Sequence, residues 1–570
     1  MELLAKNAIQ ILEDRYLLKN DKGVLTETPD ALFKRVAEYV SACEKKDTAK
    51  WNKAFYKVMS ELKFLPNSPT LMNAGCDQAQ LSACFVLPIE DSLESIFTTL
   101  KNAALIHQSG GGTGFNFSNL RPKGDLISSS KGESCGPVSF MKIYDAATEY
   151  VKQGGKRRGA NMGILNVDHP DIEEFIMSKS DKKSIENFNL SVGISNSFMK
   201  AVEEDSDWQL MNPHTQKVAR VISAKSLWEL IVQQAWKTGD PGLVFLDAIN
   251  NANTTPDLGT IQATNPCGEV PLFNNESCNL GSVNLSKIAI FNNGKYEINW
   301  DELSRIIHIG IRFLDNVITL NHYPLPEIKI TTLQSRRIGL GLMGWAELLI
   351  LLNIPYASKK ALLLAEKLMK FFQKESYDAS EKLALEHGTF PSWEISKFGI
   401  SNRKMRNATC NSIAPTGTIS VIANTSYSIE PLFALAYKRM GILGGKIQTE
   451  INDVFIQKMK DLDLWNKEME RVVIETGSLN GLKNIPKKIG AVFTTGLDIP
   501  WQYHLLHQKA FQKYTDNAVS KTINLPEKAT VRDIADIYQT AYKYGLKGIT
   551  VYRYGSRVGQ VLQKCNVNGC

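Results

Sequence analysis

The middle of this chain alternates short apolar runs, glycine-rich turns and amphipathic segments, and this alternation restricts the fold more than any other feature of the sequence. Apolar residues spaced three and four apart predict helices over residues 222–236, 303–320 and 362–386. Apolar runs typical of strands lie before, between and after these helices, at residues 163–167, 243–246 and 419–422. Strands that alternate with helices in this way predict an α/β architecture.

The two ends of the chain differ from this middle part. Residues 1 to about 60 carry apolar side chains at helical spacing, which predicts a helical N-terminal region over residues 1–62. Prolines, asparagines and glycines then gather at residues 64–75, where we expect a shaped loop without helix. Residues 558–570 are polar and lack aromatic side chains, so we expect a flexible tail there.

The composition is that of an ordinary globular protein, with 43% hydrophobic and 22% charged residues in a chain of 570. The net charge of +7 is a mild excess, which suits phosphate-bearing substrates better than nucleic acid. The first residues lack the apolar run of a signal peptide, and the longest apolar stretch, near residues 348–352, is too short to cross a membrane. We therefore expect a cytoplasmic protein with no membrane or nucleic-acid partner. Nine dispersed cysteines do not suggest a disulfide framework in that compartment.

The most informative segment is residues 263–271, Ala-Thr-Asn-Pro-Cys-Gly-Glu-Val-Pro. Cys267 stands between a proline and a glycine that prevent regular structure, with Asn265 two residues before it and Glu269 two residues after it. A cysteine can supply a sulfur radical that abstracts hydrogen, a carboxylate can take a proton from a hydroxyl, and an amide can orient that hydroxyl. From the spacing alone, a reactive cluster and a loop that happens to hold one cysteine are equally open.

Asn-Pro-Cys-Gly-Glu at residues 265–269 resembles the finger-loop motif of ribonucleotide reductases. Other stretches resemble the same family and follow its order along the chain: residues 67–75, 81–85, 110–114, 153–160, 276–281 and 414–420. The resemblance implies the ten-stranded α/β barrel of that family, with the finger loop inside it. We therefore expect the catalytic barrel over residues 63–557, between the helical N-terminal region and the tail.

The resemblance also implies roles for the reacting groups. Cys267 resembles the cysteine whose radical removes the 3′ hydrogen of the ribose, Glu269 the base at the 3′ hydroxyl, and Asn265 the amide that binds there. Cys84 and Cys278 resemble the pair that delivers two reducing equivalents and becomes a disulfide. A disulfide needs Cα atoms within about 7 Å, and the sequence does not show whether the fold brings these two together.

Two further cysteines, Cys565 and Cys570, stand in the tail. A dithiol on a flexible arm can exchange disulfides with the oxidised pair and carry the oxidation out of the site, and thioredoxin or glutaredoxin is the implied reductant. The alternatives are a disordered tail and a partial metal site; the latter lacks the four ligands of structural zinc, and we assign no metal ligand. The remaining cysteines are expected to be inert thiols: Cys43, Cys76, Cys135 and Cys410.

A second group of residues is expected to bind the substrate. The turn Pro415, Thr416, Gly417, Thr418 and Ile419 can offer hydroxyls and backbone amides to phosphate oxygens, although an ordinary turn is the alternative. The resemblance favours phosphate binding, adds Ser68, the backbone of Ala83 and Gly112 to the pocket, and implies ribonucleoside diphosphates as substrates, with triphosphates open. The glycine pattern of residues 339–344 is better explained by close helix–strand packing than by dinucleotide binding.

The family divides by the source of its radical. Tyr552 and Tyr554 lack the adjacent arrangement of the tyrosine pair that the di-metal class uses, and residues 166–175 also resemble the adenosylcobalamin class. We therefore expect adenosylcobalamin as the cofactor, although that class usually has an aspartate in place of Tyr554. No residue is assigned to the cobalt, and His169 is expected to be structural. A di-metal large subunit and a non-catalytic nucleotide-binding relative are the alternatives.

Allosteric control by deoxynucleotides is implied in the same way. Asp91, Ser92 and Leu93 resemble the place where such an effector binds at a dimer interface, so we expect a homodimer. The segment that resembles the loop relaying effector identity to the substrate base contains Gln153, Lys156, Arg157 and Arg158. Such a relay requires differential contacts in two states of the loop, and surface charge is the alternative for the arginines.

Overall fold

The computed structural model describes residues 4–127, 131–153, 157–181, 183–439, 448–479, 482, 485–556 and 562–563. Its centre is a ten-stranded sheet in the order β1-β13-β2-β3-β6-β7-β10-β20-β19, with β16 also paired to β13. The strands are β1 (Phe64–Pro66), β2 (Cys84–Val86), β3 (Gly112–Asn116), β6 (Asn161–Asn166), β7 (Phe188–Ile194), β10 (Gly242–Phe245), β13 (Glu276–Asn284), β16 (Ile338–Met343), β19 (Thr522–Leu525) and β20 (Gly548–Arg553). The expected ten-stranded α/β fold is therefore confirmed.

The strands run in two opposed groups. β2, β3, β6, β7 and β10 are parallel to one another, and the sheet turns antiparallel at the β1–β13, β13–β2 and β10–β20 pairs. Two isolated bridges join the outer strands, one between Leu340 of β16 and Asn411, the other between Ile413 and Val519 just before β19. The segment 411–413 thus links the two edges and closes the sheet.

Glycines in β16 permit this closure. A Cβ at Gly341 would lie 2.2 Å from the carbonyl oxygen of Ser412, and one at Gly339 would lie 2.8 Å from Cβ of Ser412. Only residues without a side chain allow the 411–413 segment to pass so close to the strand. The glycine pattern of residues 339–344 therefore serves packing, as expected, but against this segment rather than against a helix.

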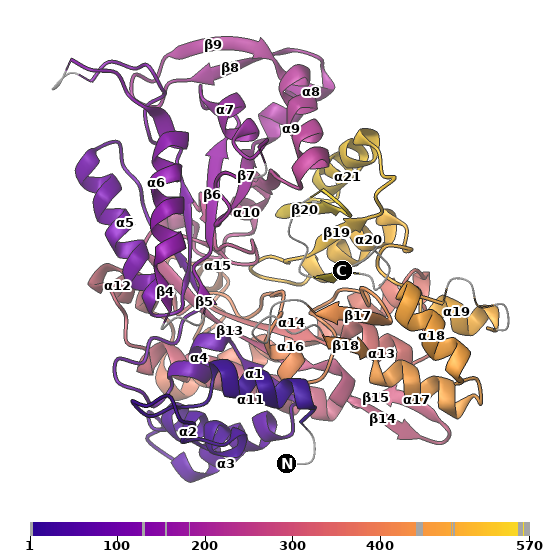
Figure 1. Ribbon diagram of the computed structural model, residues 1–570. Helices are drawn as coiled ribbons and strands as arrows, with labels where there is room; N and C mark the ends of the chain where they lie inside the picture. Colours follow the sequence, from indigo (N-terminus) through magenta and orange to yellow (C-terminus); the bar gives the residue numbers. More distant parts are fainter. Residues whose placement is uncertain are drawn as a thin grey trace.

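Helices surround the sheet (Figure 1). The N-terminal region forms α1 (Lys6–Arg15), α2 (Pro29–Ser41) and α3 (Thr48–Ser60), which lie together at the bottom of the view. The three helices predicted from apolar spacing are confirmed as α9 (Ala224–Thr238), α11 (Trp300–Leu320) and α14 (Lys359–His387). No helix of the described ranges is long and apolar enough to span a membrane.

Two local predictions were wrong. Residues 64–75 form β1 and the helix α4 (Ser68–Asn73), because the side chain of Asn67 accepts a hydrogen bond from the Thr70 amide at 2.9 Å and Pro69 falls in the first helical turn, where no amide is needed. Residues 419–422 form the short helix α16 (Ile419–Ile422) rather than a strand. Apolar runs of this length do not distinguish a strand from a buried helical turn.

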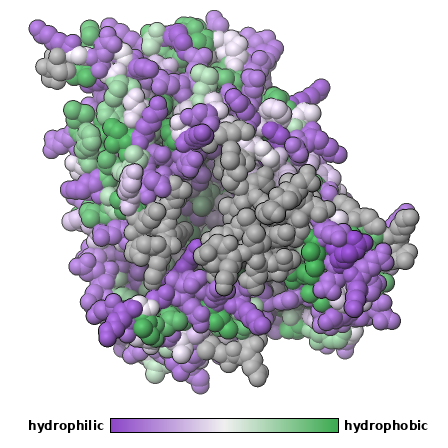
Figure 2. Space-filling model, viewed as in Figure 1, coloured by the Kyte–Doolittle hydropathy of each residue, from purple (hydrophilic) through white to green (hydrophobic). Residues whose placement is uncertain are grey.

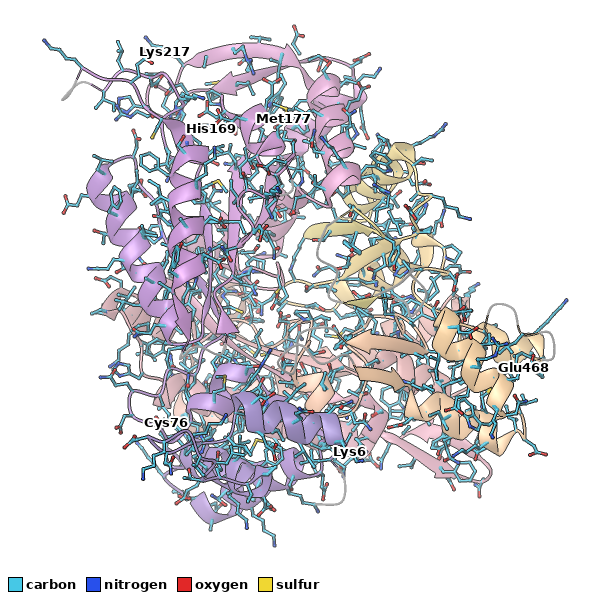
Figure 3. All side chains as sticks on the ribbon, viewed as in Figure 1. Lys6, Cys76, His169, Met177, Lys217 and Glu468 are labelled. Atoms are coloured by element: carbon cyan, nitrogen blue, oxygen red, sulfur yellow. The ribbon has the colours of Figure 1, made fainter. Side chains whose placement is uncertain are left out.

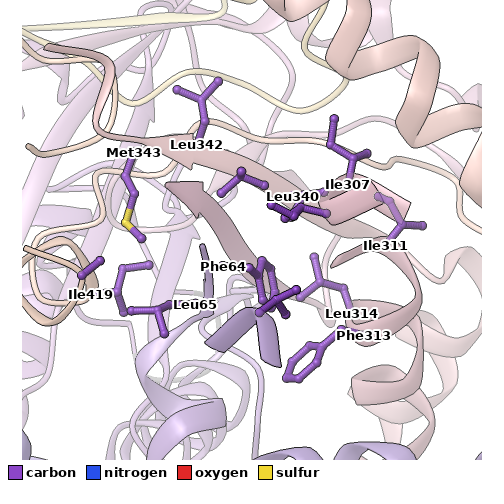
Figure 4. Close-up of a cluster of buried hydrophobic side chains, with 14 of the residues drawn as sticks. Phe64, Leu65, Ile307, Ile311, Phe313, Leu314, Leu340, Leu342, Met343 and Ile419 are labelled. Carbon is purple, nitrogen blue, oxygen red and sulfur yellow. The ribbon is translucent and has the colours of Figure 1, made fainter. Parts of the chain in front are cut away.

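A large apolar cluster holds α16 in place (Figure 4). Ile419 lies in this cluster beside Leu65 of β1 and Met343 of β16, and the cluster continues to Leu314 on α11. Burying a side chain of this size contributes about 2 kcal/mol. The position of the turn that precedes α16 is therefore fixed by the core of the protein.

A separate group of helices lies at the right of Figure 1. It comprises α17 (Asp453–Asp461), α18 (Lys467–Thr476) and α19 (Lys487–Val492), with an apolar cluster of its own. Beside them is a three-stranded sheet of β18 (Gln448–Ile451), β17 (Ala436–Arg439) and β21 (Leu562–Gln563), in that order.

Candidate active site

The segment that carries Cys267 is the tip of a small hairpin. β11 (Ala263–Thr264) and β12 (Pro271–Leu272) pair antiparallel, and the amide of Asn265 donates to the carbonyl of Val270 at 3.2 Å. The side-chain oxygen of Asn265 accepts from the Val270 amide at 2.9 Å. The amide of Gly268 donates to the Asn265 carbonyl at 3.0 Å and Gly268 has a φ of +79°, so a tight turn presents Cys267.

Several elements hold this hairpin in place. The side chain of Asn189 on β7 donates to the Pro266 carbonyl at 2.7 Å, and the Glu269 carbonyl accepts from the Ser412 hydroxyl at 2.8 Å. On β3, a Cβ at Gly114 would lie 1.8 Å from the carbonyl oxygen of Thr264. This hairpin of residues 263–272, which we call the finger hairpin, therefore fits only against a strand that lacks a side chain at the point of contact.

The structure places Cys84 and Cys278 directly opposite each other on β2 and β13. Cα atoms of opposed residues in antiparallel strands lie about 4.5–5.5 Å apart, within the limit of about 7 Å for a disulfide. Both thiols are buried, and burial raises the pKa of each well above its usual value. Asn265 donates to the Cys84 sulfur at 3.2 Å, so the finger hairpin touches this pair.

Glu269 is the second titratable group of the cluster. Its side chain is buried, and burial raises the pKa of the carboxyl from 4.5 to about 7, although a hydrogen bond from Asn265 acts in the opposite direction. Its Oε2 atom has no hydrogen-bond partner among the described residues. A carboxyl group with a pKa near neutrality can both accept and return a proton at physiological pH.

Cys267 also lines a cavity of about 380 Å³. Its walls come from the finger hairpin and from β7, β10, β19 and β20, and its lining residues include Cys267, Gln508, Lys521 and Tyr552. None of Asn265, Glu269, Cys84 and Cys278 is among the described residues that line it. Cys267 thus stands between two surroundings, the buried cluster and this cavity, which we call the chamber.

The chamber contains buried polar groups. The Gln508 amide nitrogen donates to the Gly548 carbonyl at 2.8 Å, which fixes the orientation of the amide, and its Oε1 atom has no partner among the described residues. Lys521 is buried, forms an ion pair with Glu430, and lies 3.1 Å from Nδ1 of His504. Burial lowers the pKa of Lys521, while Glu430 opposes this shift.

The turn before α16 borders both surroundings of Cys267, and its first residue, Pro415, lines the chamber. Ala414, immediately before it, belongs to the same apolar cluster as Cys84 and Cys278. Within the turn, Thr416 has a φ of +55°, and its hydroxyl accepts from the Ser428 amide at 2.8 Å. A Cβ at Gly417 would meet no atom within 4 Å, so this part of the turn is open.

Of the remaining substrate-binding candidates, Ala83 and Gly112 lie beside the cysteine pair, and Ser68 lies at the start of α4. Ser68, at the start of α4, hydrogen-bonds the hydroxyl of Tyr16 at 2.7 Å. The amide of Ala83 donates to the Cys278 carbonyl at 3.1 Å, and the Ala83 carbonyl accepts from Gly112 at 2.9 Å. A Cβ at Gly112 would lie 2.9 Å from Cγ of Pro266, so this glycine also makes room for the finger hairpin.

The described effector candidates lie at the start of α5 and on the strands β4 and β5. Asp91 forms an ion pair with Arg121 at 2.8 Å, and the Ser92 hydroxyl caps α5 (Leu93–Gln108) by accepting from the Ser95 amide at 3.1 Å. Gln153 ends β4 (Lys152–Gln153), which pairs with β5 (Arg157–Arg158). Lys156, Cys565 and Cys570 lie outside the described residues.

His169, labelled in the upper part of Figure 3, contacts backbone groups through both ring nitrogens. Its Nε2 atom lies 2.8 Å from the Leu120 carbonyl, and its Nδ1 atom accepts from the Asp171 amide at 3.0 Å. Both ring nitrogens are therefore engaged within the fold. No cluster of three or more metal-ligating side chains occurs in the part of the chain that the structure describes.

Some residues of the site were not found from the sequence. Asn189, Ser412, Gln508 and Lys521 come from four separate segments, and none stands in a recognisable local pattern. Their roles depend on long-range contacts that the closed sheet creates. The apolar runs around them predicted their strands and helices but not these contacts.

Comparison with known proteins agrees with this arrangement. The family description "Ribonucleotide reductase, barrel domain" matches residues 82–552, and "Ribonucleotide reductase, all-alpha domain" matches residues 2–79. A "Vitamin B12-dependent ribonucleoside-diphosphate reductase" of Thermoplasma acidophilum is 47% identical over 619 residues, covering 98% of this chain and 80% of that protein. A protein of the same description from Mycobacterium tuberculosis is 46% identical over 564 residues, with 98% and 80% covered.

A solved structure, "Actinobacillus ureae class Id ribonucleotide reductase alpha subunit", superposes with a TM-score of 0.80. It covers 97% of this chain and 98% of that one at 24% identity, and this likeness supports the fold alone. The family matches extend over the finger hairpin, the cysteine pair and the turn before α16. On these grounds the chain belongs to the ribonucleotide reductase family.

Proposed function

We propose that this chain reduces ribonucleoside diphosphates to 2′-deoxyribonucleoside diphosphates by a thiyl-radical mechanism, with adenosylcobalamin as the source of the radical. The observation that carries the proposal is the position of Cys267 between a buried cluster of Asn265, Glu269 and two opposed cysteines and a chamber of about 380 Å³. The names of the two relatives above, B12-dependent ribonucleoside-diphosphate reductases, support the same substrate class and cofactor.

Cys267 and each group of the buried cluster have a chemical role in this proposal. Cys267, as a thiyl radical, removes the 3′ hydrogen of the ribose, while Glu269 takes the proton of the 3′ hydroxyl and Asn265 orients that hydroxyl. Cys84 and Cys278 supply two electrons and two protons, the 2′ hydroxyl leaves as water, and the two sulfurs form a disulfide. Cys267 then recovers its radical as the 3′ hydrogen returns to the sugar.

The chamber fits the nucleoside part of the cofactor. Its volume lies at the lower end of the range of about 300–1,000 Å³ for small-molecule sites. Gln508 offers an acceptor without a partner among the described residues, and Lys521 brings a buried cation to the wall. When bound, adenosylcobalamin supplies radical initiation, and the chain supplies the enclosure and the thiol that receives the radical. Gln508 and Lys521 are the residues that would hold the adenosyl group.

Substrate and reductant use other parts of the site. The turn Pro415, Thr416, Gly417, Thr418 and Ile419 would bind the substrate phosphates, with Ser68, Ala83 and Gly112 around the sugar. Cys565 and Cys570 would reduce the Cys84–Cys278 disulfide and pass the oxidation to thioredoxin or glutaredoxin. Deoxynucleotide effectors would bind at Asp91, Ser92 and Leu93, with Gln153, Lys156, Arg157 and Arg158 as the relay.

A homodimer formed through α5 and α6 (Gly136–Tyr150) belongs to the same proposal. Leu93, Phe97 and Leu105 are exposed at spacings of four and eight on α5, and Ile143 and Tyr150 are exposed seven residues apart on α6. Hydrophobic residues gather over this side of the molecule in Figure 2. An exposed apolar surface on two neighbouring helices suits association with a second copy.

Anaerobic incubation of the purified chain with CDP, dithiothreitol and a dATP or dTTP panel, with and without adenosylcobalamin, tests the proposal. We expect dCDP only when the cofactor is present. The variant Cys267→Ser should bind nucleotide and form no product, while Cys135→Ser, which changes an exposed cysteine at the start of α6, should retain activity. Turnover by Cys267→Ser would contradict the mechanism, and absence of product with the cofactor would favour a missing radical-generating subunit.

A further inference from the structure

The last described residues of the chain form a strand on a sheet that belongs to another part of the protein. Leu562 and Gln563 of β21 pair antiparallel with Arg439 and Lys438 of β17. The opposite edge of β17 is occupied by β18, with Lys438 facing Thr449. The tail therefore completes a three-stranded sheet as its third strand.

β17 is suited to accept such a strand. A two-stranded hairpin leaves one row of backbone amides and carbonyls of each strand without ladder partners, and an extended segment can satisfy them by strand addition. A third strand also stabilises a hairpin that is marginal by itself. Recognition of this kind depends on backbone groups and tolerates many side chains, which suits a polar tail.

The segment that leads into β17 contacts the proposed phosphate turn and the start of β19. Phe433 and Ala434, just before β17, line a second cavity of about 270 Å³ together with Ser420 of α16. Glu430, a few residues earlier, accepts from the Thr522 amide at 2.9 Å and pairs with Lys521. Ser428 donates to the Thr416 hydroxyl at 2.8 Å, so the chain that leads to β17 is fastened to the proposed phosphate turn.

We propose that the edge of β17 opposite β18 is the docking strand for the chain's own C-terminal arm, which starts each re-reduction from this position. The inference rests on the proposed shuttle role of Cys565 and Cys570. These cysteines follow Gln563 by two and seven residues, and an extended chain spans at most about 7 Å and about 25 Å over those lengths. Docking would thereby tether the dithiol to a strand that follows the segment bonded to the phosphate turn, and so raise its effective concentration at the site.

The Cys84–Cys278 disulfide is reduced by two successive thiol–disulfide exchanges with the arm. A thiolate of the arm attacks one sulfur of the Cys84–Cys278 disulfide, and a mixed disulfide forms as the other sulfur leaves as a thiolate. The second thiolate of the arm then attacks the mixed disulfide. Cys84 and Cys278 return to thiols, and Cys565 and Cys570 become a disulfide that the external dithiol protein reduces. Two electrons move from the arm to the buried pair.

A disulfide trap tests the docking itself. In the full chain with Cys565→Ser and Cys570→Ser, the pair Lys438→Cys and Gln563→Cys should form an intramolecular disulfide on mild oxidation, identified by peptide mass spectrometry, because opposed residues lie about 4.5–5.5 Å apart. The control pair Thr449→Cys and Gln563→Cys should not, because two strand spacings place its Cα atoms about 10 Å apart. Equal yields for the two pairs, no disulfide in the first, or a link between two chains would overturn the proposal.

A second experiment tests the role of docking in turnover. Leu562→Pro with Gln563→Pro removes both backbone amides, including the one that faces β17, whereas Leu562→Ala with Gln563→Ala retains them. We expect the proline variant to turn over at least about threefold more slowly with a thioredoxin system and at an unchanged rate with dithiothreitol, which reduces the buried pair directly. Equal rates for the proline and alanine variants would refute the docking, whereas inactivity of every chain with dithiothreitol would refute the proposed function instead.

Discussion

The titration of Glu269 provides the sharpest test of the site. Burial raises the pKa of this carboxyl from 4.5 to about 7. If Glu269 is the proton acceptor, kcat/KM should fall about tenfold per pH unit below pH 7, because only the ionised carboxyl accepts the proton. Glu269→Gln should lower kcat by about 10²–10⁴-fold and remove this dependence. Product formation measured chromatographically from pH 5.5 to 8.5 gives both quantities.

The same shift affects stability, in the opposite sense to an ordinary ion-paired acid. A raised pKa means that stability is fully present below pH 4.5 and is lost as the pH rises through about 7. The rise in pKa from 4.5 to about 7 corresponds to about 3 kcal/mol of unfolding free energy, because one pKa unit is worth about 1.4 kcal/mol. Glu269→Gln mimics the neutral form, so it should be as stable as the natural chain at pH 4.5 and more stable by up to about 3 kcal/mol at pH 8.

Thermal unfolding of the two proteins over this pH range measures the difference. For 570 residues, about 3 kcal/mol corresponds to about 2–3 °C in Tm. The two Tm curves should converge at low pH and separate between pH 5 and 8. Parallel curves, together with an unchanged pH dependence of kcat/KM, would refute the argument that burial of Glu269 controls its proton.

Three further predictions follow from the packing, the chamber and the exposed helices. Gly114→Ala should displace the finger hairpin, because its Cβ would meet the Thr264 carbonyl at 1.8 Å, and we expect about 2 kcal/mol lower stability and about a hundredfold loss of kcat. Gly490→Ala in α19, with no contact closer than 3.8 Å, should lower neither, because alanine is the better helix former. Gln508→Leu should weaken adenosylcobalamin binding about tenfold, measured by visible absorption, and unchanged affinity would remove Gln508 from the proposed cofactor site. Phe97→Glu should convert a dimer to a monomer in light scattering, and a persistent dimer would exclude α5 as the interface.

The sequence was informative where chemistry is concentrated in short segments. Residues 263–271 predicted an irregular turn that presents Cys267. The structure has such a turn, held by hydrogen bonds that join Asn265 to Val270 and Gly268. Long apolar patterns predicted α11 and α14 because burial of one helical face leaves a clear period. The pairing of Cys84 with Cys278 could be expected only from the resemblance, since strand register depends on residues far apart in the chain.

The wrong predictions have a common physical origin. Residues 64–75 and 419–422 are short segments whose conformation is decided by a cap or by tertiary burial rather than by their own periodicity. The chamber could not be predicted for a related reason. Gln508, Lys521 and Tyr552 meet there only because β20 pairs with β10, β19 pairs with β20, and α20 (Trp501–Gln512) contacts β19.

The closure of the sheet by residues 411–413 has a consequence for the order of assembly. The finger hairpin at residues 263–272 leaves the ribosome well before the segment 411–413 and before β19 and β20. The hairpin can therefore settle against β3 while one side of the sheet is still open, and the last strands then close around it. A circularly permuted chain that begins near residue 400 would deliver the closing strands first. Such a chain should fold more slowly and lose more material to aggregation than the natural one.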